Sequence, residues 1–300
     1  MNKINGLIAA TYPPLDQSGK LNLAAIGPYA EFLAKNRVNG AFLNGSTGDF
    51  TSLSVIERKQ IVEEWSRCKP AGFDLMVHVG DTNVDQSIEL ARHASKLEVD
   101  AIASLAPFYY KPAKVGDLVN ICKQIAAVTP NIPFYYYHIP QLSGVNFDMV
   151  EFLELAAQDI PNLGGIKYSQ QDLIQLMRCN NFLNGKYEML FGVDEILLCA
   201  LTLGVTCAVG STYNYLAPLN HRMIEAYKNG TIQEAQALQY QVVQLVSILS
   251  KYGFHAASKH VLKYLGIDLG PVRMPMPNLN NREKETLEKE LATIRIFELV

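Results

Sequence analysis

The sequence predicts an α/β fold, a (β/α)8 TIM barrel with a C-terminal helical extension. Short apolar segments alternate with capped amphipathic segments over the first two-thirds of the chain, which is the pattern of βα units. Eight apolar segments start about 20 to 35 residues apart, the period of right-handed βα crossovers. No Gly-x-Gly-x-x-Gly motif follows the first segment, which favours a closed barrel over a doubly wound sheet.

The predicted strands are mostly apolar along their whole length, as expected for strands buried on both faces. They are Asn5–Ala10, Gly40–Leu43, Asp74–Val79, Ala101–Leu105, Pro133–Tyr137, Gly164–Tyr168, Glu188–Phe191 and Thr206–Val209. In a barrel of this class, the active site lies at the C-terminal ends of the strands. Functional residues are therefore expected at strand ends and in the loops that follow them.

Capping motifs mark two of the helices between the strands. A capping box at Ser54–Glu57 begins a predicted helix that ends near Cys68, because a serine followed three residues later by a glutamate satisfies free N–H groups of the first turn. Thr82–Asp85 begins another predicted helix, which extends to about Leu97.

After about Leu216 the predicted strands stop and helices continue alone. A second capping box at Thr231–Glu234 begins a long helix that Gly253 ends, since glycine is the common residue just past a helix C-terminus. Shorter helices are predicted at Ala256–Leu265 and Arg282–Ile296.

The composition fits one barrel and its extension. The chain has 300 residues, of which 49% are hydrophobic and 18% charged, as in ordinary globular proteins. A single α/β barrel takes about 250 residues. We therefore expect residues 1–230 to form a barrel that carries the active site, and residues 231–300 to form a helical region packed on it.

Charge and residue patterns exclude several kinds of partner. A net charge of −3 gives no long-range attraction to nucleic acid or to anionic membranes, and no run approaches the ~20 apolar residues of a membrane span. The six histidines form no metal-binding pair, so no metal is expected. Five cysteines without a C-x-x-C pair are expected to be reduced core residues. A small-molecule substrate and a cytoplasmic location follow from these observations.

Lys167 lies in the sixth predicted strand, which is otherwise apolar. A charge is costly in a barrel interior, and burial favours the neutral amine, which is the nucleophile that condenses with a ketone to give a Schiff base. The alternative is a lysine that pairs with a buried acid or points outward between the helices. The strand alone does not decide between these interpretations.

Tyr137 ends the fifth predicted strand and shares a strand face with Tyr135. If that face points into the barrel, the phenol of Tyr137 can pass a proton to or from a reacting hydroxyl. A tyrosine that only fills core space is the commoner case. Proximity to Lys167 would favour the catalytic interpretation.

Two further loops carry polar side chains at strand ends. Ser46 and Thr47 lie in a Gly-Ser-Thr-Gly loop, which offers hydroxyl and N–H groups to a carboxylate or phosphate but also suits an ordinary turn. Asp194 and Glu195 precede an apolar helix, whose N-terminus they would stabilise without any ligand. With Ser211 after the next strand, they could instead bind the hydroxyls of a sugar.

Four segments together resemble the N-acetylneuraminate lyase and dihydrodipicolinate synthase superfamily, over most of the barrel and into the helical extension. In the family's order and spacing, the chain contains Gly45-Ser46-Thr47-Gly48, Tyr137-His138-Ile139-Pro140, Gly165-Ile166-Lys167 and Gly210-Ser211-Thr212-Tyr213-Asn214. The resemblance implies a class I aldolase, usually a homotetramer, that takes pyruvate as a Schiff base. No cofactor is expected, because the iminium itself is the electron sink.

The resemblance also implies roles for individual residues. Lys167 matches the Schiff-base lysine and Tyr137 the proton-transfer residue of the family. Ser46 and Thr47 would hold the carboxylate derived from pyruvate. Tyr110 matches a family tyrosine that reaches into the site of a neighbouring subunit.

Leu142 distinguishes between two branches of this family. The dihydrodipicolinate synthase branch has an arginine at this position for a second carboxylate, and leucine cannot replace it. The segment 191–195 instead looks like the sialic-acid lyase branch, in which residues matching Gly192, Asp194, Glu195 and Ser211 bind the hydroxylated tail of the substrate.

The expected reaction is the reversible cleavage of the sialic acid N-acetylneuraminate to pyruvate and N-acetylmannosamine. Alternatives are a lyase for another 2-keto-3-deoxy sugar acid, a dihydrodipicolinate-type synthase, and a catalytically silent sugar-acid binding protein. Two residues depart from the commonest family pattern: Asp49 stands where glutamate is usual, and His138 where many relatives have asparagine. Neither is expected to touch the reacting groups directly, but His138 resembles the animal-type sequences of the lyase branch and is a candidate for tuning the sugar pocket.

Overall fold

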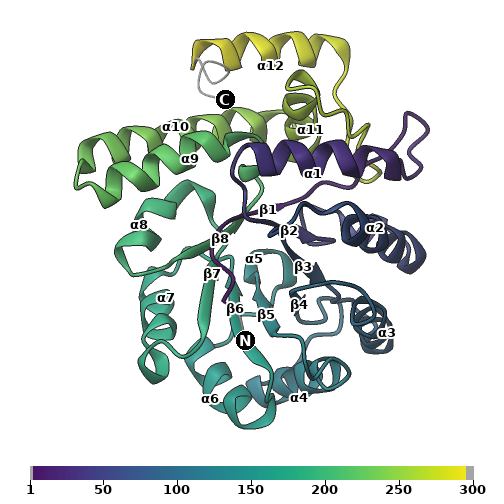
Figure 1. Ribbon diagram of the computed structural model, residues 1–300, viewed down its shortest axis with the longest axis vertical. Helices are drawn as coiled ribbons and strands as arrows, with labels where there is room; N and C mark the ends of the chain where they lie inside the picture. The colour runs from purple at the N-terminus through teal and green to yellow at the C-terminus, as the bar shows by residue number, and fades with distance from the viewer. Residues whose placement is uncertain (1–2, 295–300) are drawn as a thin grey trace.

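The computed structural model describes residues 3–294 and shows eight parallel strands that close into a barrel, with β8 paired to β1 (Figure 1). The strands are β1 (Gly6–Ala10), β2 (Gly40–Leu43), β3 (Asp74–His78), β4 (Ala101–Ser104), β5 (Phe134–His138), β6 (Leu163–Tyr168), β7 (Glu188–Phe191) and β8 (Cys207–Gly210). Each lies within one residue of its predicted bounds at both ends. The predicted (β/α)8 TIM barrel with a C-terminal helical extension is confirmed.

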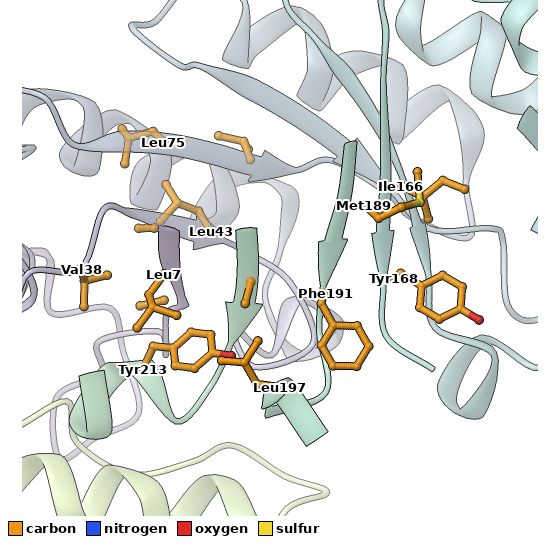
Figure 2. Close-up of a cluster of buried hydrophobic side chains, with 14 of the residues drawn as sticks. Leu7, Val38, Leu43, Leu75, Ile166, Tyr168, Met189, Phe191, Leu197 and Tyr213 are labelled. Atoms are coloured by element: carbon orange, nitrogen blue, oxygen red, sulfur yellow. The ribbon is translucent and has the colours of Figure 1, made fainter. Parts of the chain in front are cut away.

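Side chains along each strand alternate between two apolar cores. Ile8, Met76 and Leu190 belong to an inner cluster within the barrel. Their strand neighbours, such as Leu7 and Phe191, belong to a larger outer cluster between the strands and the helices, part of which is drawn in Figure 2. Because both faces are buried, the strands lack the polar alternation of a half-exposed sheet.

Helices surround the barrel and connect its strands (Figure 1). They are α1 (Ile26–Lys35), α2 (Val55–Cys68), α3 (Val84–Ala94), α4 (Val115–Ala126), α6 (Met149–Asp159), α7 (Leu173–Asn180) and α8 (Leu197–Thr202), with the short α5 (Pro140–Ser143) in the loop after β5. The 3-10 turns are η1 (Leu23–Ala25), η2 (Phe50–Ser52), η3 (Phe182–Asn184) and η4 (Asp194–Ile196).

The predicted N-terminal caps of α2 and α3 have different outcomes. The capping box of α2 is confirmed, since Ser54 accepts from the Glu57 N–H and Glu57 accepts from the Ser54 N–H. For α3 the cap is Asn83, whose side chain accepts from two N–H groups of the first turn. Thr82 lies before this cap, and its hydroxyl bonds Asp81. The helix ends at Ala94, three residues before the predicted end near Leu97.

The C-terminal helices are α9 (Tyr213–Lys228), α10 (Ile232–Lys251), α11 (Phe254–Tyr264) and α12 (Asn281–Thr293). Helices α9 and α10 lie side by side, with α12 above them in Figure 1. The predicted capping box of α10 is wrong, because the Thr231 hydroxyl donates to the carbonyl of Ala226 and caps no N–H group. The last two residues of the predicted final helix, 295 and 296, lie outside the described residues.

Within residues 3–294, no helix is long and apolar enough to cross a membrane. In the same part of the chain, no three His, Cys, Asp or Glu side chains are grouped so that they could hold a metal ion. Cys122, Cys179 and Cys207 are buried free thiols, as expected. Cys199 is exposed, contrary to expectation, because α8 turns its neighbours Leu198 and Ala200 toward the core instead.

Candidate active site

Lys167 points into the barrel near the C-terminal end of β6. Its side-chain nitrogen donates to the hydroxyl of Ser169 at 3.1 Å and lies 4.9 Å from the centroid of the Phe42 ring. The residue is only 3% exposed, yet it forms no ion pair with any described residue. Neither structural alternative, a buried salt bridge or an outward-pointing lysine, describes this side chain.

Tyr137 lies beside Lys167 on the neighbouring strand, at the same register position. The Lys167 nitrogen is 3.7 Å from the centroid of the Tyr137 ring. The Tyr137 hydroxyl is 3.2 Å from Oγ of Ser46. Tyr135 shares the inner face, as predicted, but its hydroxyl donates to Glu188 at the start of β7. Tyr137 therefore joins the lysine to the loop after β2.

That loop holds Ser46 close to the barrel mouth. A β-carbon at Gly48 would lie 2.9 Å from Cα of Asn44, so the tight turn requires glycine at that position. The carbonyl of Ser46 accepts a hydrogen bond from Nε2 of His255 on α11 at 3.1 Å. Thr47 follows Ser46 and is half-buried. The C-terminal extension thus supports the loop that faces Tyr137.

A cleft of about 910 Å³ opens beside this group, a size in the range of small-molecule sites. Gly192, Asp194, Glu195 and Ser211, the residues predicted for a sugar tail, all line it. A β-carbon at Gly192 would overlap the hydroxyl of Ser169 and lie 3.4 Å from the Lys167 nitrogen. Glycine at 192 therefore leaves space between the lysine and the cleft.

Asp194 is a buried carboxylate that lines the cleft at the first residue of η4. Oδ2 accepts from the backbone N–H of Thr212 at 2.8 Å, and a β-carbon at Gly210 would overlap the carboxylate. Burial raises the pKa of Asp194, while the hydrogen bond from Thr212 and the charge of Lys167 oppose that rise. Burial, followed by the charge of Asp194, also raises the pKa of Glu195.

Two groups are missing from the site of a single chain: a cation at position 142 and the side chain of Tyr110. Leu142 lines the cleft and is 66% exposed, so this position offers no cation to a second carboxylate. Tyr110 is 87% exposed and does not line the cleft; its ring contacts that of Tyr109 at 5.1 Å. The structure does not bring Tyr110 to Lys167 in the same chain.

Comparison with known proteins identifies the family of this chain. Residues 3–294 match the Dihydrodipicolinate synthetase family. The chain belongs to this family. An N-acetylneuraminate lyase of Rattus norvegicus is 38% identical to it over 300 residues, which cover 98% of this chain and 94% of the rat enzyme.

Solved structures agree with this assignment. The N-acetylneuraminate lyase of Proteus mirabilis superposes with a TM-score of 0.95 at 37% identity and covers 98% of this chain and 100% of that one. The N-acetylneuraminate lyase of Aliivibrio salmonicida gives 0.95 at 38% identity, with 99% and 98% covered. The predictions of a carbon–carbon lyase and of the sialic-acid lyase branch of the family are confirmed.

The structure adds two site residues that the sequence did not suggest. Ser169 bonds the Lys167 nitrogen, and Gln170 lines the cleft and is bonded to His138. Thr212, which follows Ser211 after the eighth predicted strand, holds Asp194 through its backbone N–H. Ser169 lies two residues after Lys167, so strand alternation at the end of β6 was a signal that could have found it.

Proposed function

We propose that the chain is a cytoplasmic N-acetylneuraminate lyase that works through a Schiff base on Lys167. The observation that carries the proposal is the position of Lys167. It is a buried amine without a carboxylate partner, it lies against the ring of Tyr137, and it donates to the hydroxyl of Ser169, which lines the polar cleft. Such an amine can act as a nucleophile toward a ketone.

The proposed cleavage begins when the Lys167 nitrogen attacks C2 of the open-chain keto acid and water is lost, which leaves an iminium. Tyr137 takes the proton of the C4 hydroxyl, the C3–C4 bond breaks, and its electron pair moves into the iminium to give an enamine. N-acetylmannosamine leaves as the aldehyde. Protonation of the enamine at C3 and hydrolysis of the new iminium then release pyruvate and the free amine.

The remaining site residues hold the two ends of the substrate. We place the substrate carboxylate at Ser46 and Thr47, because the Ser46 hydroxyl already meets the Tyr137 hydroxyl at 3.2 Å. We place the hydroxylated tail along the cleft, where Asp194 and Glu195 supply hydrogen-bond acceptors and Gly192 and Ser211 complete the wall. Carboxylates accept from several hydroxyls at once.

We further propose a homotetramer in which Tyr110 completes the site of a neighbouring copy. Tyr109 and Tyr110 form an exposed aromatic pair after β4, the kind of surface that is enriched in protein interfaces. A native mass four times that of the chain is expected. A monomer that is fully active would contradict the role of Tyr110.

Borohydride trapping tests the Schiff base. The enzyme is incubated with pyruvate, reduced, and digested, and the adduct is located by peptide mass. We expect one adduct, on Lys167. Peptide mass separates it from Lys259, the other lysine that is buried among the described residues. No adduct in the wild type would refute the proposal and favour a silent sugar-acid binding protein, whereas an adduct on another lysine would refute the role of Lys167.

A substrate panel tests the choice of sugar acid. N-acetylneuraminate should be cleaved faster than 2-keto-3-deoxygluconate, which lacks the longer tail. Aspartate semialdehyde with pyruvate should react slowest, because Leu142 offers no cation to its carboxylate. A preference for the semialdehyde would show that the chain is a dihydrodipicolinate-type synthase despite Leu142.

A further inference from the structure

A buried histidine that the proposed reaction does not use holds a glutamine on the cleft wall. Gln170 follows β6 and lines the cleft, and its Oε1 is hydrogen-bonded to Nε2 of His138, the last residue of β5. His138 is completely buried, and its Nδ1 has no hydrogen-bond partner among residues 3–294. His138 itself does not line the cleft.

The burial of His138 determines which way the glutamine amide faces. Burial lowers the pKa of His138 to about 4, so the ring carries a single proton at neutral pH. We assign that proton to Nε2, because a buried N–H at Nδ1 would have no acceptor. Nε2 then donates to Oε1 of Gln170. The NH2 group of Gln170, which bonds no other described residue, is left as a donor at the cleft wall.

From this geometry we infer that Gln170 is a specificity residue that donates a hydrogen bond to the carbonyl oxygen of the substrate's acylamino group. The inference rests on the proposed function. An amide NH2 only donates, whereas the carboxylates of Asp194 and Glu195 only accept. In N-acetylneuraminate, each other oxygen of the tail belongs to a hydroxyl that can serve those carboxylates. The acetyl carbonyl alone is a pure acceptor, and it suits Gln170.

His138 is a positioning residue in this arrangement. It fixes the amide of Gln170 by occupying Oε1, so the glutamine does not have to lose rotational freedom when substrate binds. Without the imidazole, the amide can turn its oxygen toward the cleft. A carbonyl facing the acetyl carbonyl would weaken binding of that group.

Two substrates test the inference: N-acetylneuraminate and the analogue in which a hydroxyl replaces the acetamido group. Gln170→Met removes the donor at similar length. We expect its kcat/KM for N-acetylneuraminate to fall roughly 10-fold, mainly through KM, and its kcat/KM for the analogue to change less than about 2-fold. His138→Phe should act in the same direction in the wild type but have little effect when Gln170→Met is already present.

Gln171→Met is the matched control, because Gln171 is an exposed glutamine of the same loop that also lines the cleft but is not bonded to His138. Equal losses on both substrates in Gln170→Met, or additive effects with His138→Phe, would overturn the inference, and so would an equal effect of Gln171→Met. Borohydride trapping of pyruvate separates the two proposals. A wild-type adduct on Lys167 with no change in substrate preference would refute the role of Gln170 alone, whereas a missing wild-type adduct would refute the proposed function.

Discussion

The side-chain nitrogen of Lys167 lies 3.7 Å from the centroid of the Tyr137 ring. At this distance the face of an aromatic ring stabilises a cation, so the same ring can stabilise the iminium that the proposed reaction forms. The Tyr137 hydroxyl points on to Ser46 at 3.2 Å. In the proposed reaction the two parts of this side chain would therefore have separable tasks: the ring would support the charged intermediate, and the hydroxyl would move the proton.

Tyr137→Phe should separate these tasks. The variant keeps the ring and loses the hydroxyl, so turnover of N-acetylneuraminate should fall by about 10² to 10⁴, the usual contribution of general acid–base catalysis. The borohydride-trapped pyruvate adduct should persist. Tyr137→Leu, which also removes the ring, should reduce the adduct as well. A Phe variant that traps as little pyruvate as Lys167→Ala would contradict the division of tasks.

Gly192→Ala should impair the lysine itself. The new methyl group would overlap the Ser169 hydroxyl and lie 3.4 Å from the Lys167 nitrogen, so Ser169, the hydrogen-bond partner of that nitrogen, must move. We expect a lower rate of pyruvate adduct formation in single-turnover trapping, and turnover reduced in proportion. Adduct formation at the wild-type rate would show that the cleft wall tolerates the methyl group.

Gly210→Ala should instead affect the substrate tail. Its methyl group would overlap the Asp194 carboxylate, which is fixed by the Thr212 N–H. We expect KM for N-acetylneuraminate to rise roughly 10-fold, because a hydrogen bond to a charged group contributes about 1.5–3 kcal/mol. Pyruvate trapping should change less than in Gly192→Ala. The opposite ranking of the two variants would argue against the proposed placement of the tail.

The strands could be predicted from sequence because each is a continuous apolar segment bounded by turn residues. Strands that are buried on both faces have this pattern along their whole length. Lys167 and Tyr137 could be singled out as candidates for a related reason, and the resemblance to the family then supplied their expected roles. Polar groups at the ends of buried strands are costly unless they have a function or a partner. In the barrel the two side chains lie close together, because Tyr137 and Lys167 occupy the same register position on the neighbouring strands β5 and β6.

Other features depended on contacts that no local pattern contains. Thr231 and Glu234 have the spacing of a capping box, but the Thr231 hydroxyl donates to the carbonyl of Ala226 near the end of α9 instead. The bond between His138 and Gln170 requires β5 and β6 to be neighbours in a known register. Tyr110 does not line the cleft of its own chain, so the role proposed for it requires a second chain.

Stability in acid should depend on the ion pair of Glu57 with Arg273, which ties the segment before α12 to the start of α2. The Arg273 side chain, chiefly, lowers the pKa of Glu57 from 4.5 to about 2. Because the folded-state pKa is depressed, the stabilisation is complete above pH 4.5 and is lost as the pH falls through about 2.

Glu57→Gln should therefore lower the free energy of unfolding at pH 7 by up to about 3 kcal/mol. The difference in this free energy between variant and wild type should narrow between pH 4.5 and 3, measured by urea unfolding at fixed protein concentration. Glu89→Gln, which removes the more exposed pair with Lys59, is the control and should change little. A gap that stays constant with pH would contradict this role of the Glu57 carboxylate.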